Sequence, residues 1–302
     1  MPITLPELSV IVPVKDRHSE LLNAVASIAS QGVPCELLIV DDGSRIPIEA
    51  PTNLPDYVKL RMFRHASSQG PAAARNTGLE SASTTWVAFL DSDDVWIPGS
   101  LAPRLAAARE AAARNPGELV AWAAGFRYVN AEGNAHRERA PYGTADWRLF
   151  ASGCWFCPGS TAIVPRARML ATVGPQDESL RRLEDLDWFL RFALAGGRLA
   201  VWPGVAAEIK PAREHSADLV ESAGERLLAK FAARPGIPPR QRKTLLRRLR
   251  AYLALERGAI AWHSGRRIEA AAEVARSLAI FPRASLQIER YWSQVDQLNR
   301  RR

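Results

Sequence analysis

Cysteine and long apolar runs are both scarce in this chain. Its three cysteines are too few for a disulfide framework, which agrees with a reducing compartment. No stretch approaches the roughly 18 consecutive apolar residues that span a bilayer. The N-terminus shows neither a basic segment nor an apolar stretch of signal-peptide length. We therefore expect a cytoplasmic protein whose membrane contact, if it has one, is peripheral at the inner face of the membrane.

Several nucleotide-binding and metal-binding signatures are also missing. Neither G-x-G-x-x-G after the first predicted strand nor G-x-x-x-x-G-K-[ST] occurs, so a dinucleotide cradle and a P-loop both lack support. Cys154 and Cys157 have the spacing of a zinc half-site, but no second Cys or His pair stands nearby. We interpret them as buried, inert thiols. A diphosphate bound by this chain would need a metal ion rather than a glycine-rich loop.

Charge is unevenly distributed along the 302 residues. Residues 1–215 carry 22 Lys and Arg against 24 Asp and Glu, whereas residues 216–302 carry 18 against 8. The formal net charge of +8 therefore belongs to the C-terminal part and does not indicate a nucleic-acid-binding protein. We predict two parts, a larger domain over residues 1–215 and a basic helical region over residues 216–302.

Short apolar runs alternate with helical patterns over the first hundred residues. The predicted strands are Leu8–Pro13, Glu36–Val40, Lys59–Phe63 and a run that starts at Trp86. Apolar residues recur at the helical period over Ser19–Gln31, where Ser19 can cap the helix and Gly32 can end it, and a second helix begins at Gly70. This alternation predicts βαβ units and a mainly parallel sheet, which is an α/β fold.

Carboxylates follow directly after three of these strands. They are Asp16, Asp41, Asp42, Asp91, Asp93 and Asp94. Because ligands bind outside the carboxyl ends of parallel strands, we expect this topology to collect them on one edge of the sheet. The three carboxylates of Asp91–Asp94 repel one another, which favours a hard divalent cation with a diphosphate behind it. The alternative is a solvated turn followed by a helix N-cap.

The second half of the larger domain is less regular. We predict a helix over residues 100–114, a hairpin from Leu119–Val129 and Asn134–Arg139, and a loop with a short strand over 158–164. A helix with an acidic first turn follows from Glu184. At about 100° per residue, Asp185 borders the apolar face and Glu184 lies opposite it, so we expect Glu184 to face water. The alternative is that these acids only complement the helix dipole.

The basic C-terminal region has the pattern of packed helices. Residues 240–250 set six basic side chains beside leucines, which suits either contact with anionic lipid or a solvated helix face. Gly258, Gly265, Ala270, Val274 and Pro282 fall at tetratricopeptide-like spacing and predict a helical hairpin. One such repeat cannot form a solenoid, so we expect it to pack on the larger domain or to pair with a second protomer.

Five motifs stand in the order and at the intervals of the family-2 glycosyltransferases of the GT-A fold. They are Ser9–Asp16, Ile39–Ser44, Gly70–Gly78, Phe89–Asp94 and Glu184-Asp185. The chain resembles that family over roughly residues 7–215. The resemblance implies a Rossmann-like, mostly parallel sheet flanked by helices, with an all-α C-terminal region. One departure is Val14-Lys15, where the family often has Tyr-Asn.

The resemblance also implies roles for individual residues. The implied donor-nucleotide residues are Pro13, Asp16, Asp42, Arg75, Asp91 and Ser92, and the implied ligands of Mg²⁺ or Mn²⁺ are Asp93, Asp94 and His215. Asp185 would be the catalytic base of an inverting displacement. At an ordinary pKa of about 3.9 it would be ionised at neutral pH. Glu184, Trp155 and Trp188 are the implied acceptor contacts, although Trp is more often a core residue.

The function implied by the resemblance is metal-dependent transfer of a sugar from a UDP- or dTDP-sugar to a glycan or lipid-linked acceptor in cell-surface polysaccharide synthesis. We expect no nucleic-acid partner, and we expect either membrane contact or a homodimer through the C-terminal helices. Two alternatives remain. A sugar nucleotidyltransferase would carry a glycine-rich loop near the N-terminus, and Val10–Arg17 contains no glycine. A non-catalytic binding module would bind a donor without turning it over.

Overall fold

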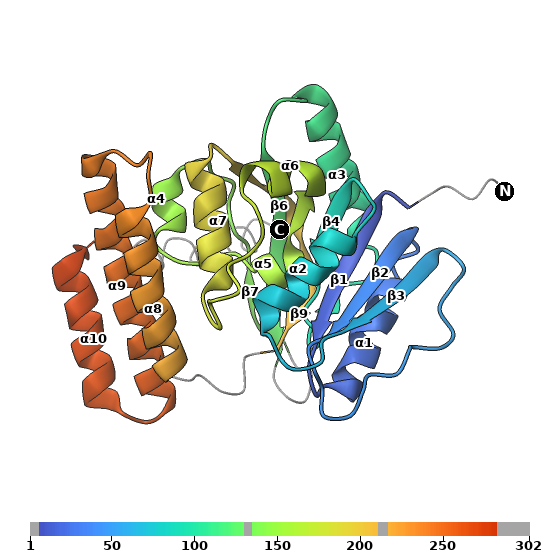
Figure 1. Cartoon of the computed structure of the whole chain (residues 1–302), viewed down its shortest axis with the longest axis horizontal. Coiled ribbons are helices and arrows are strands. Elements are labelled where there is room, and N and C mark those ends of the chain that lie inside the picture. Colours follow the sequence, from blue (N-terminus) through green and yellow to red (C-terminus); the bar gives the residue numbers. More distant parts are fainter. Residues whose placement is uncertain (1–5, 130–134, 211–216, 283–302) are drawn as a thin grey trace.

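The computed structural model describes residues 6–129, 135–210 and 217–282. Within these residues one nine-stranded sheet crosses the larger part of the molecule, and helices cover both of its faces (Figure 1). The strands are β1 (Leu8–Val14), β2 (Cys35–Asp41), β3 (Val58–Arg64), β4 (Trp86–Phe89), β5 (Val95–Trp96), β6 (Val120–Val129), β7 (Ala135–Arg139), β8 (Ile163–Pro165) and β9 (Arg198–Ile209). The helices are α1 (His18–Ala29), α2 (Pro71–Ser81), α3 (Leu101–Arg114), α4 (Trp147–Phe150), α5 (Pro158–Thr161), α6 (Arg166–Thr172), α7 (Glu184–Leu194), α8 (Ala217–Ala233), α9 (Pro239–His263) and α10 (Arg267–Ile280).

The order of the strands sets where a ligand can bind. The order is β3-β2-β1-β4-β8-β6-β9-β5, with β7 beside β6, and the first four strands run parallel. From β1 the next two strands, β2 and β3, are added on one side of β1, and β4 is then added on the other side. Such a reversal leaves a crevice at the carboxyl ends of the two strands that flank it. The site is therefore expected beyond the ends of β1 and β4.

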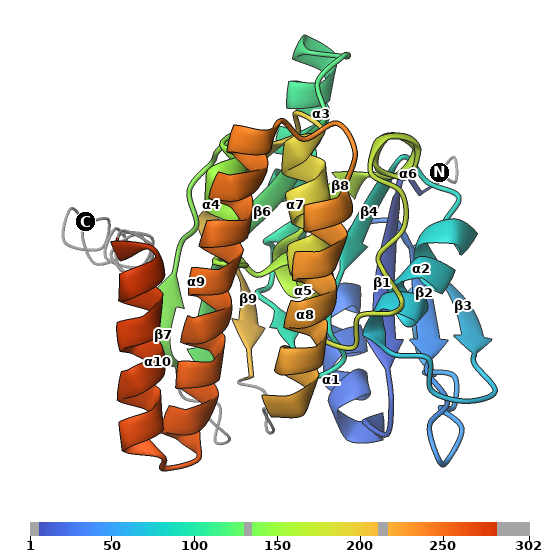
Figure 2. The same cartoon turned by 60° about the vertical axis from the view of Figure 1, so that its left-hand side comes forward.

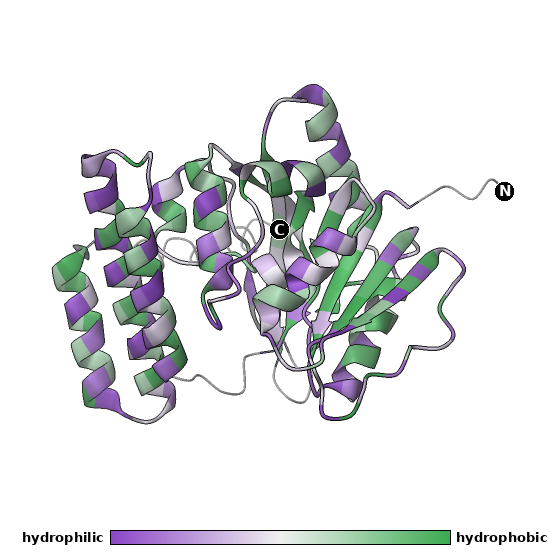
Figure 3. Cartoon of the chain, in the orientation of Figure 1, coloured by the Kyte–Doolittle hydropathy of each residue, from purple (hydrophilic) through white to green (hydrophobic). Residues whose placement is uncertain are grey.

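The sheet buries apolar side chains on both faces because successive side chains along each strand point to opposite faces of the sheet. Ile11 and Leu38 point to the face covered by α2 and α7, whereas Val10 and Val12 point to the face covered by α1 and α3. All seven residues of β2 are buried, as expected of a parallel strand covered on both sides. In Figure 3 these central strands are among the most hydrophobic parts of the molecule.

Two local predictions need correction. The first helix runs over His18–Ala29 and its N-cap is Arg17, not Ser19, because the chain turns at Asp16 with φ 54° and enters the helix directly. The Ser19 hydroxyl donates to the neighbouring Glu20 carboxylate instead. Part of the predicted loop before β8 is the short helix α5. The predicted hairpin is present as antiparallel β6 and β7, and its turn lies outside the described residues.

The C-terminal helices share a hydrophobic core with the larger part. Phe231 of α8 and Leu249 of α9 belong to the same buried cluster as Leu186 and Phe189 of α7. Figures 1 and 2 show α8 and α9 standing beside α4 and α7, with α10 outermost. The predicted helical hairpin is confirmed as α9 and α10, which meet at Gly265. The predicted domain boundary falls at residues 215 and 216, outside the described residues, and stays a prediction.

The leucines of residues 240–250 pack against the core of the molecule, Leu246 being partly buried there. Leu245 and Leu249 are fully buried, whereas Arg240, Lys243 and Arg247 are exposed. This burial favours the solvated face of a packed helix, and contact of the exposed basic side chains with a membrane stays a prediction. No helix within the described residues is both long enough and apolar enough to cross a membrane.

Candidate active site

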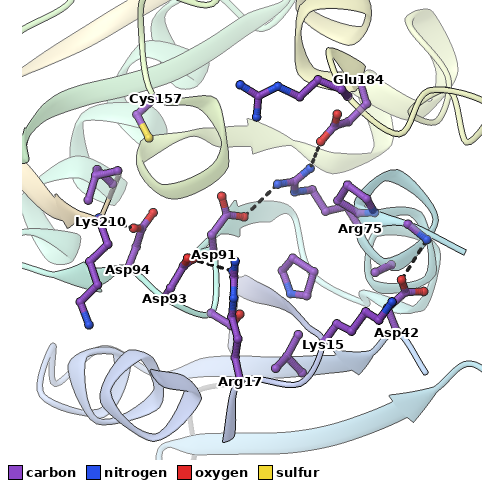
Figure 4. A pocket seen from close by; sticks show the side chains of 18 of the residues that line it. Lys15, Arg17, Asp42, Arg75, Asp91, Asp93, Asp94, Cys157, Glu184 and Lys210 are labelled. Atoms are coloured by element: carbon purple, nitrogen blue, oxygen red, sulfur yellow. Dashed lines mark hydrogen bonds and ion pairs between the residues drawn. The ribbon is translucent and has the colours of Figure 1, made fainter. Parts of the chain in front are cut away.

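A cavity of about 990 Å³ lies beyond the carboxyl ends of β1 and β4 (Figure 4). Its lining includes Pro13, Asp42, Arg75, Asp91, Ser92, Asp93, Asp94 and Glu184, which come from five segments between residues 13 and 184. The predicted gathering of strand-end acids is thus observed for Asp42 and for the three acids after β4. Asp41 is an exception: it is buried outside the cavity and pairs with Arg64. Asp16 does not line the cavity either.

Asp16 is turned away from the cavity by its backbone. Its left-handed φ of 54° directs the carboxylate to the loop after β2, where it accepts a hydrogen bond from the Arg45 N–H at 2.8 Å. The Asp16 N–H donates to the Ser44 hydroxyl at 2.9 Å. Asp16 therefore ties together the two loops that follow β1 and β2, and a direct contact with the donor nucleotide stays a prediction.

Asp42 holds the loop that forms one wall of the cavity. Its carboxylate accepts hydrogen bonds from the Ser68 hydroxyl at 2.7 Å and from the Gln69 and Gly70 N–H groups at 2.8 and 2.9 Å, and it lies 2.7 Å from His65 Nδ1. Burial tends to raise the pKa of Asp42, but these hydrogen bonds lower it below its ordinary value. Asp42 is consequently a fixed, ionised acceptor beside the cavity, which suits its predicted role at the nucleoside.

Arg75 of α2 joins three carboxylates at the centre of the site. The buried guanidinium donates to Asp91 at 2.8 Å and to Glu184 at 2.9 Å (Figure 4). It also lies 3.7 Å from the Asp185 carboxylate. Burial would lower the pKa of Arg75, yet the three carboxylates raise it well above its ordinary value. Arg75 therefore fixes the loop after β4 against the first turn of α7, and its predicted contact with the nucleotide is untested.

The position of Glu184 corrects the prediction that it faces water. Its side chain is 9% exposed and is paired with Arg75. The helix begins after Leu183, whose φ of 65° aims the first turn of α7 at α2. Helical periodicity shows only which side chains share a face of α7. It could not reveal that the Arg75 guanidinium of α2 pairs with Glu184.

Asp185 has an environment that suits a general base. Its carboxylate is 24% exposed and opens into a second cavity next to the first. Burial, together with the charges of Glu184 and Asp91, raises the pKa of Asp185 to about 7 against the opposing effect of Arg75. The expectation of an ordinary Asp pKa is thus wrong. A base with a pKa near neutrality can accept a proton and also release it readily.

The two predicted metal ligands after β4 have different surroundings. Asp94 is buried, and its carboxylate accepts hydrogen bonds from the Ser160 hydroxyl at 2.5 Å and the Lys210 N–H at 3.1 Å. Asp93 is 21% exposed and pairs with the Arg17 guanidinium at 2.9 Å. Burial raises the pKa of both carboxyls. Asp93 is therefore the ligand more open to a cation, which would have to displace Arg17.

The available oxygen atoms fit a divalent cation that is held jointly with a substrate. Among the described residues, no group of three or more His, Cys, Asp or Glu side chains is assembled to hold a metal. Mg²⁺ is commonly held by one or two carboxylates, with water and substrate phosphates completing its shell. Asp93, together with the nearby Asp91, can supply these carboxylate ligands. His215 lies outside the described residues, and its predicted role stays a prediction.

The two predicted acceptor tryptophans differ in what they can touch. Trp188 is fully buried, packs edge-on against Phe89 and Phe189, and donates its indole N–H to the Gly174 carbonyl at 2.8 Å. It is a core residue and has no ring face open to a sugar, so that prediction is wrong. Trp155 lines the second cavity beside Asp185.

The basic residues of the site, apart from Arg75, are the part that the sequence analysis missed. The first cavity is lined by Lys15, Arg17, Arg75, Arg139, Arg181, Arg182 and Lys210, which outnumber its five carboxylates. Such a lining attracts phosphate groups. A signal was present in the sequence, because Arg181-Arg182 stands just before the acidic pair and Arg139 ends a predicted strand. His263, from α9, also reaches this cavity.

The parallel half-sheet, its point of reversal and the cavity beside it define a GT-A glycosyltransferase fold. Two solved structures share the fold. S. aureus TarS 1-349 in complex with UDP-GlcNAc matches with a TM-score of 0.59 and 18% identity, over 92% of this chain and 81% of that one. The mannosyltransferase PcManGT from Pyrobaculum calidifontis, in complex with GDP-Man and Mn²⁺, matches with a TM-score of 0.54 and 22% identity, over 94% and 79%.

The family model "Glycosyl transferase family 2" matches residues 9–167, and the chain belongs to that family. The predicted resemblance is thereby confirmed. A relative from Mycobacterium tuberculosis, the pre-mycofactocin glycosyltransferase, is 32% identical over 212 residues, which cover 65% of this chain and 41% of the relative. The chain therefore spans about two fifths of the length of that relative.

Proposed function

We propose that this chain is an inverting, metal-dependent glycosyltransferase. It takes a sugar from a nucleotide-diphosphate donor, UDP- or dTDP-linked, and transfers it to a hydroxyl of a glycan or lipid-linked acceptor in cell-surface polysaccharide synthesis. The observation that carries the proposal is the pair of adjoining cavities: a basic one with Asp93 open at its wall, and one that holds Asp185 with a pKa of about 7. Relatives described as complexes with UDP-GlcNAc and with GDP-Man and Mn²⁺ support the donor class and the metal.

The donor side of the reaction follows from the charges of the first cavity. Lys15, Arg17 and Lys210 lie where a diphosphate would need cations, and Asp42 lies on the wall formed by the loop after β3. A divalent cation at Asp93, when bound, supplies Lewis-acid stabilisation of the diphosphate as a leaving group. Asp93 would hold this cation, and Arg17, which pairs with Asp93 in its absence, would then be available to a phosphate oxygen.

The acceptor side depends on Asp185. Its carboxylate accepts the proton of the acceptor hydroxyl while that oxygen forms a bond to the anomeric carbon. The bond from the anomeric carbon to the diphosphate oxygen breaks on the opposite face, and its electron pair leaves with the diphosphate. Arg75 and Glu184 hold Asp185 at the boundary between the two cavities. A single carboxylate acts on the sugar, unlike the paired acids of glycoside hydrolases.

Metal-dependent nucleotide binding tests the donor site. We expect UDP or dTDP to bind the full chain in the presence of Mn²⁺, and we expect Asp93→Ala to weaken that binding about tenfold or more, because the open carboxylate ligand is lost. Calorimetric titration of UDP, dTDP and GDP, each with and without Mn²⁺, measures this. Asp56→Ala, which removes an exposed carboxylate before β3, is the control and leaves binding unchanged. Failure of every nucleotide to bind under all metal conditions contradicts the proposal.

The pH dependence of transfer tests the base. Because Asp185 must be ionised to accept a proton and its pKa is about 7, kcat/KM rises with pH up to about 7 and is level above it. Below that value we expect a fall of about tenfold per pH unit. The measurement is release of the free nucleotide from the sugar nucleotide found to be turned over, between about pH 5.5 and 9. A profile that is flat across this range rules out Asp185 as the base.

The two alternatives give different products in the same assays. A sugar nucleotidyltransferase would release pyrophosphate from a nucleoside triphosphate and a sugar 1-phosphate, and a binding module would bind the nucleotide without any turnover. No observation in the described part of the chain favours either one. Cytoplasmic location, membrane contact and a homodimer stay predictions.

A further inference from the structure

A second cavity, of about 500 Å³, opens where Asp185 is exposed. It is bounded by the first turn of α7, by the segment 152–155 and by α9, and it shares Tyr128, Arg182 and Glu184 with the first cavity. A group bound in it would therefore reach the donor cavity at the point where Asp185 lies. Nothing in the proposed function assigns a role to α9, although that helix supplies one wall.

The wall is one face of α9. Tyr252, Leu255, Glu256 and Ala259 all line the second cavity, and their spacing of three and four residues places them on one side of the helix. One turn further along, His263 lines the first cavity. The C-terminal region therefore contributes to both cavities, and the larger part of the chain alone does not enclose the second one.

Contacts with buried groups keep this wall in place. Arg248 of α9 donates to the Arg148 carbonyl and to the Ser152 hydroxyl, both at 3.1 Å. Gly153 has a φ of 128°, and a Cβ added there would lie 2.5 Å from the ring of Tyr252. Only glycine allows both that backbone conformation and the close approach of the tyrosine ring. The position of Tyr252 in the cavity is thus determined by residues on both sides.

The two cavities carry opposite charge. The first has more basic than acidic side chains, whereas the second is lined by three carboxylates, Glu184, Asp185 and Glu256, and by one guanidinium, Arg182. The aromatic residues Tyr128, Trp155 and Tyr252 also line the second cavity. A diphosphate suits the first lining. The acidic lining of the second cavity repels phosphate and carboxylate groups. Its carboxylates and aromatic rings suit a sugar ring, which has hydroxyl donors at its edge and C–H groups on its faces.

Glu256 has an oxygen atom available for such a hydroxyl. One carboxylate oxygen accepts a hydrogen bond from the Tyr252 hydroxyl at 2.5 Å. The other lies 3.9 Å from the nearest Arg182 nitrogen, which is beyond hydrogen-bond distance, and the side chain is 22% exposed. A carboxylate is an acceptor only, so a ligand hydroxyl can donate to it.

We propose that the second cavity binds the acceptor as a neutral glycosyl residue, with Glu256 of α9 accepting one of its hydroxyls and Asp185 facing the hydroxyl that attacks. The cavity discriminates against anionic acceptors such as uronic acids and phosphorylated polyols. This inference rests on the proposed function. It extends that function by making the C-terminal helices part of the acceptor site and by specifying the charge class of the acceptor.

Binding of simple glycosides to the full chain tests the inference. The probes are methyl β-D-glucoside, methyl β-D-galactoside and methyl N-acetyl-β-D-glucosaminide as neutral sugars and methyl β-D-glucuronide as the anion, with UDP and Mg²⁺ present. Saturation-transfer NMR gives each dissociation constant. We expect at least one neutral glycoside to bind, the glucuronide to bind about tenfold more weakly or not at all, and Glu256→Gln to weaken the neutral glycoside about tenfold.

Two further variants show whether a loss of glycoside binding comes from the second cavity or from a general disturbance of the fold. Ala259→Trp fills the cavity from an exposed position on α9 and is expected to abolish glycoside binding without disturbing the core. Glu269→Gln, an exposed carboxylate on α10, is the matched control and leaves binding unchanged. UDP binding, measured by calorimetry in every variant, remains at the wild-type value.

The outcomes distinguish this inference from the proposed function. If none of UDP, dTDP and GDP binds the wild-type chain under any metal condition, the proposed function fails. If UDP binds but no glycoside does, or if Glu256→Gln and Glu269→Gln have equal effects, the acceptor inference is wrong and the donor site stands. Tighter binding of the glucuronide than of the neutral sugars also overturns it, because the cavity would then not select by charge.

Discussion

Replacement of Asp185 by Asn is expected to lower the rate of sugar transfer by about 10²–10⁴-fold, the usual contribution of a positioned general base. The amide keeps the shape of the carboxylate but has no basic oxygen for the proton of the acceptor hydroxyl. Because Asp185 opens into the second cavity and is not part of the lining of the first, the affinity for the nucleotide should stay at the wild-type value. Steady-state transfer and calorimetric nucleotide titration, made on the same preparation, measure the two effects.

Asp218→Asn is the matched control for this change. Asp218 also stands in the first turn of a helix, α8, but it is exposed and away from both cavities. It should transfer sugar at the wild-type rate. If Asp185→Asn keeps more than about a tenth of the wild-type rate, Asp185 contributes less than general-base catalysis normally does, and the assignment of the base is wrong.

Replacement of Arg75 by Met is expected to reduce the free energy of unfolding by about 3–5 kcal/mol, the usual cost of removing one partner from a buried ion pair. Arg75 is buried and is the cation that pairs with both Asp91 and Glu184. Without it, Glu184 is left buried without its counter-charge, and methionine supplies only the volume of the lost side chain. Urea-induced unfolding at pH 7 measures the change.

The same variant should also move the pH profile of transfer. Arg75 opposes the effects that raise the pKa of Asp185, so its removal lets that pKa rise above about 7 and shifts the rising limb of activity to higher pH. Arg114→Met, which removes an exposed i,i+4 pair on α3, is the control and should cost less than about 0.5 kcal/mol. A loss below about 1 kcal/mol for Arg75→Met would mean that the three carboxylates do not depend on this guanidinium.

Much of the donor half of the site could be predicted from local sequence. A strand that ends in Asp, followed by a helix, places its carboxylate at the edge of a parallel sheet whatever the rest of the chain does. Asp42, Asp91 and Asp93 were located in this way and line the first cavity. The family could also be identified, because four of its five motifs lie within residues 9–167, where the family model matches.

The acceptor half could not be predicted in the same way. Trp188 was a candidate for sugar contact, but periodicity on α7 cannot reveal that Phe89 and Gly174 cover its ring. Glu256 and Tyr252 stand in a helix whose pattern indicated only a basic, packed hairpin. Their place beside Asp185 depends on how α9 is docked, and the docking contacts join residues about a hundred positions apart, such as Arg248 and Ser152.

The sequence by itself determined the α/β fold, the family and the acidic edge of the sheet, because strand and helix periodicities and strand-end acids act over a few residues. Only the tertiary structure decided that Arg75 joins Asp91 to Glu184, that the pKa of Asp185 is raised to about 7, and that α9 closes a second cavity. The physical reason is that burial and ion pairing depend on which distant segments meet. Arg75 and Glu184 are 109 residues apart, and no local pattern encodes their contact.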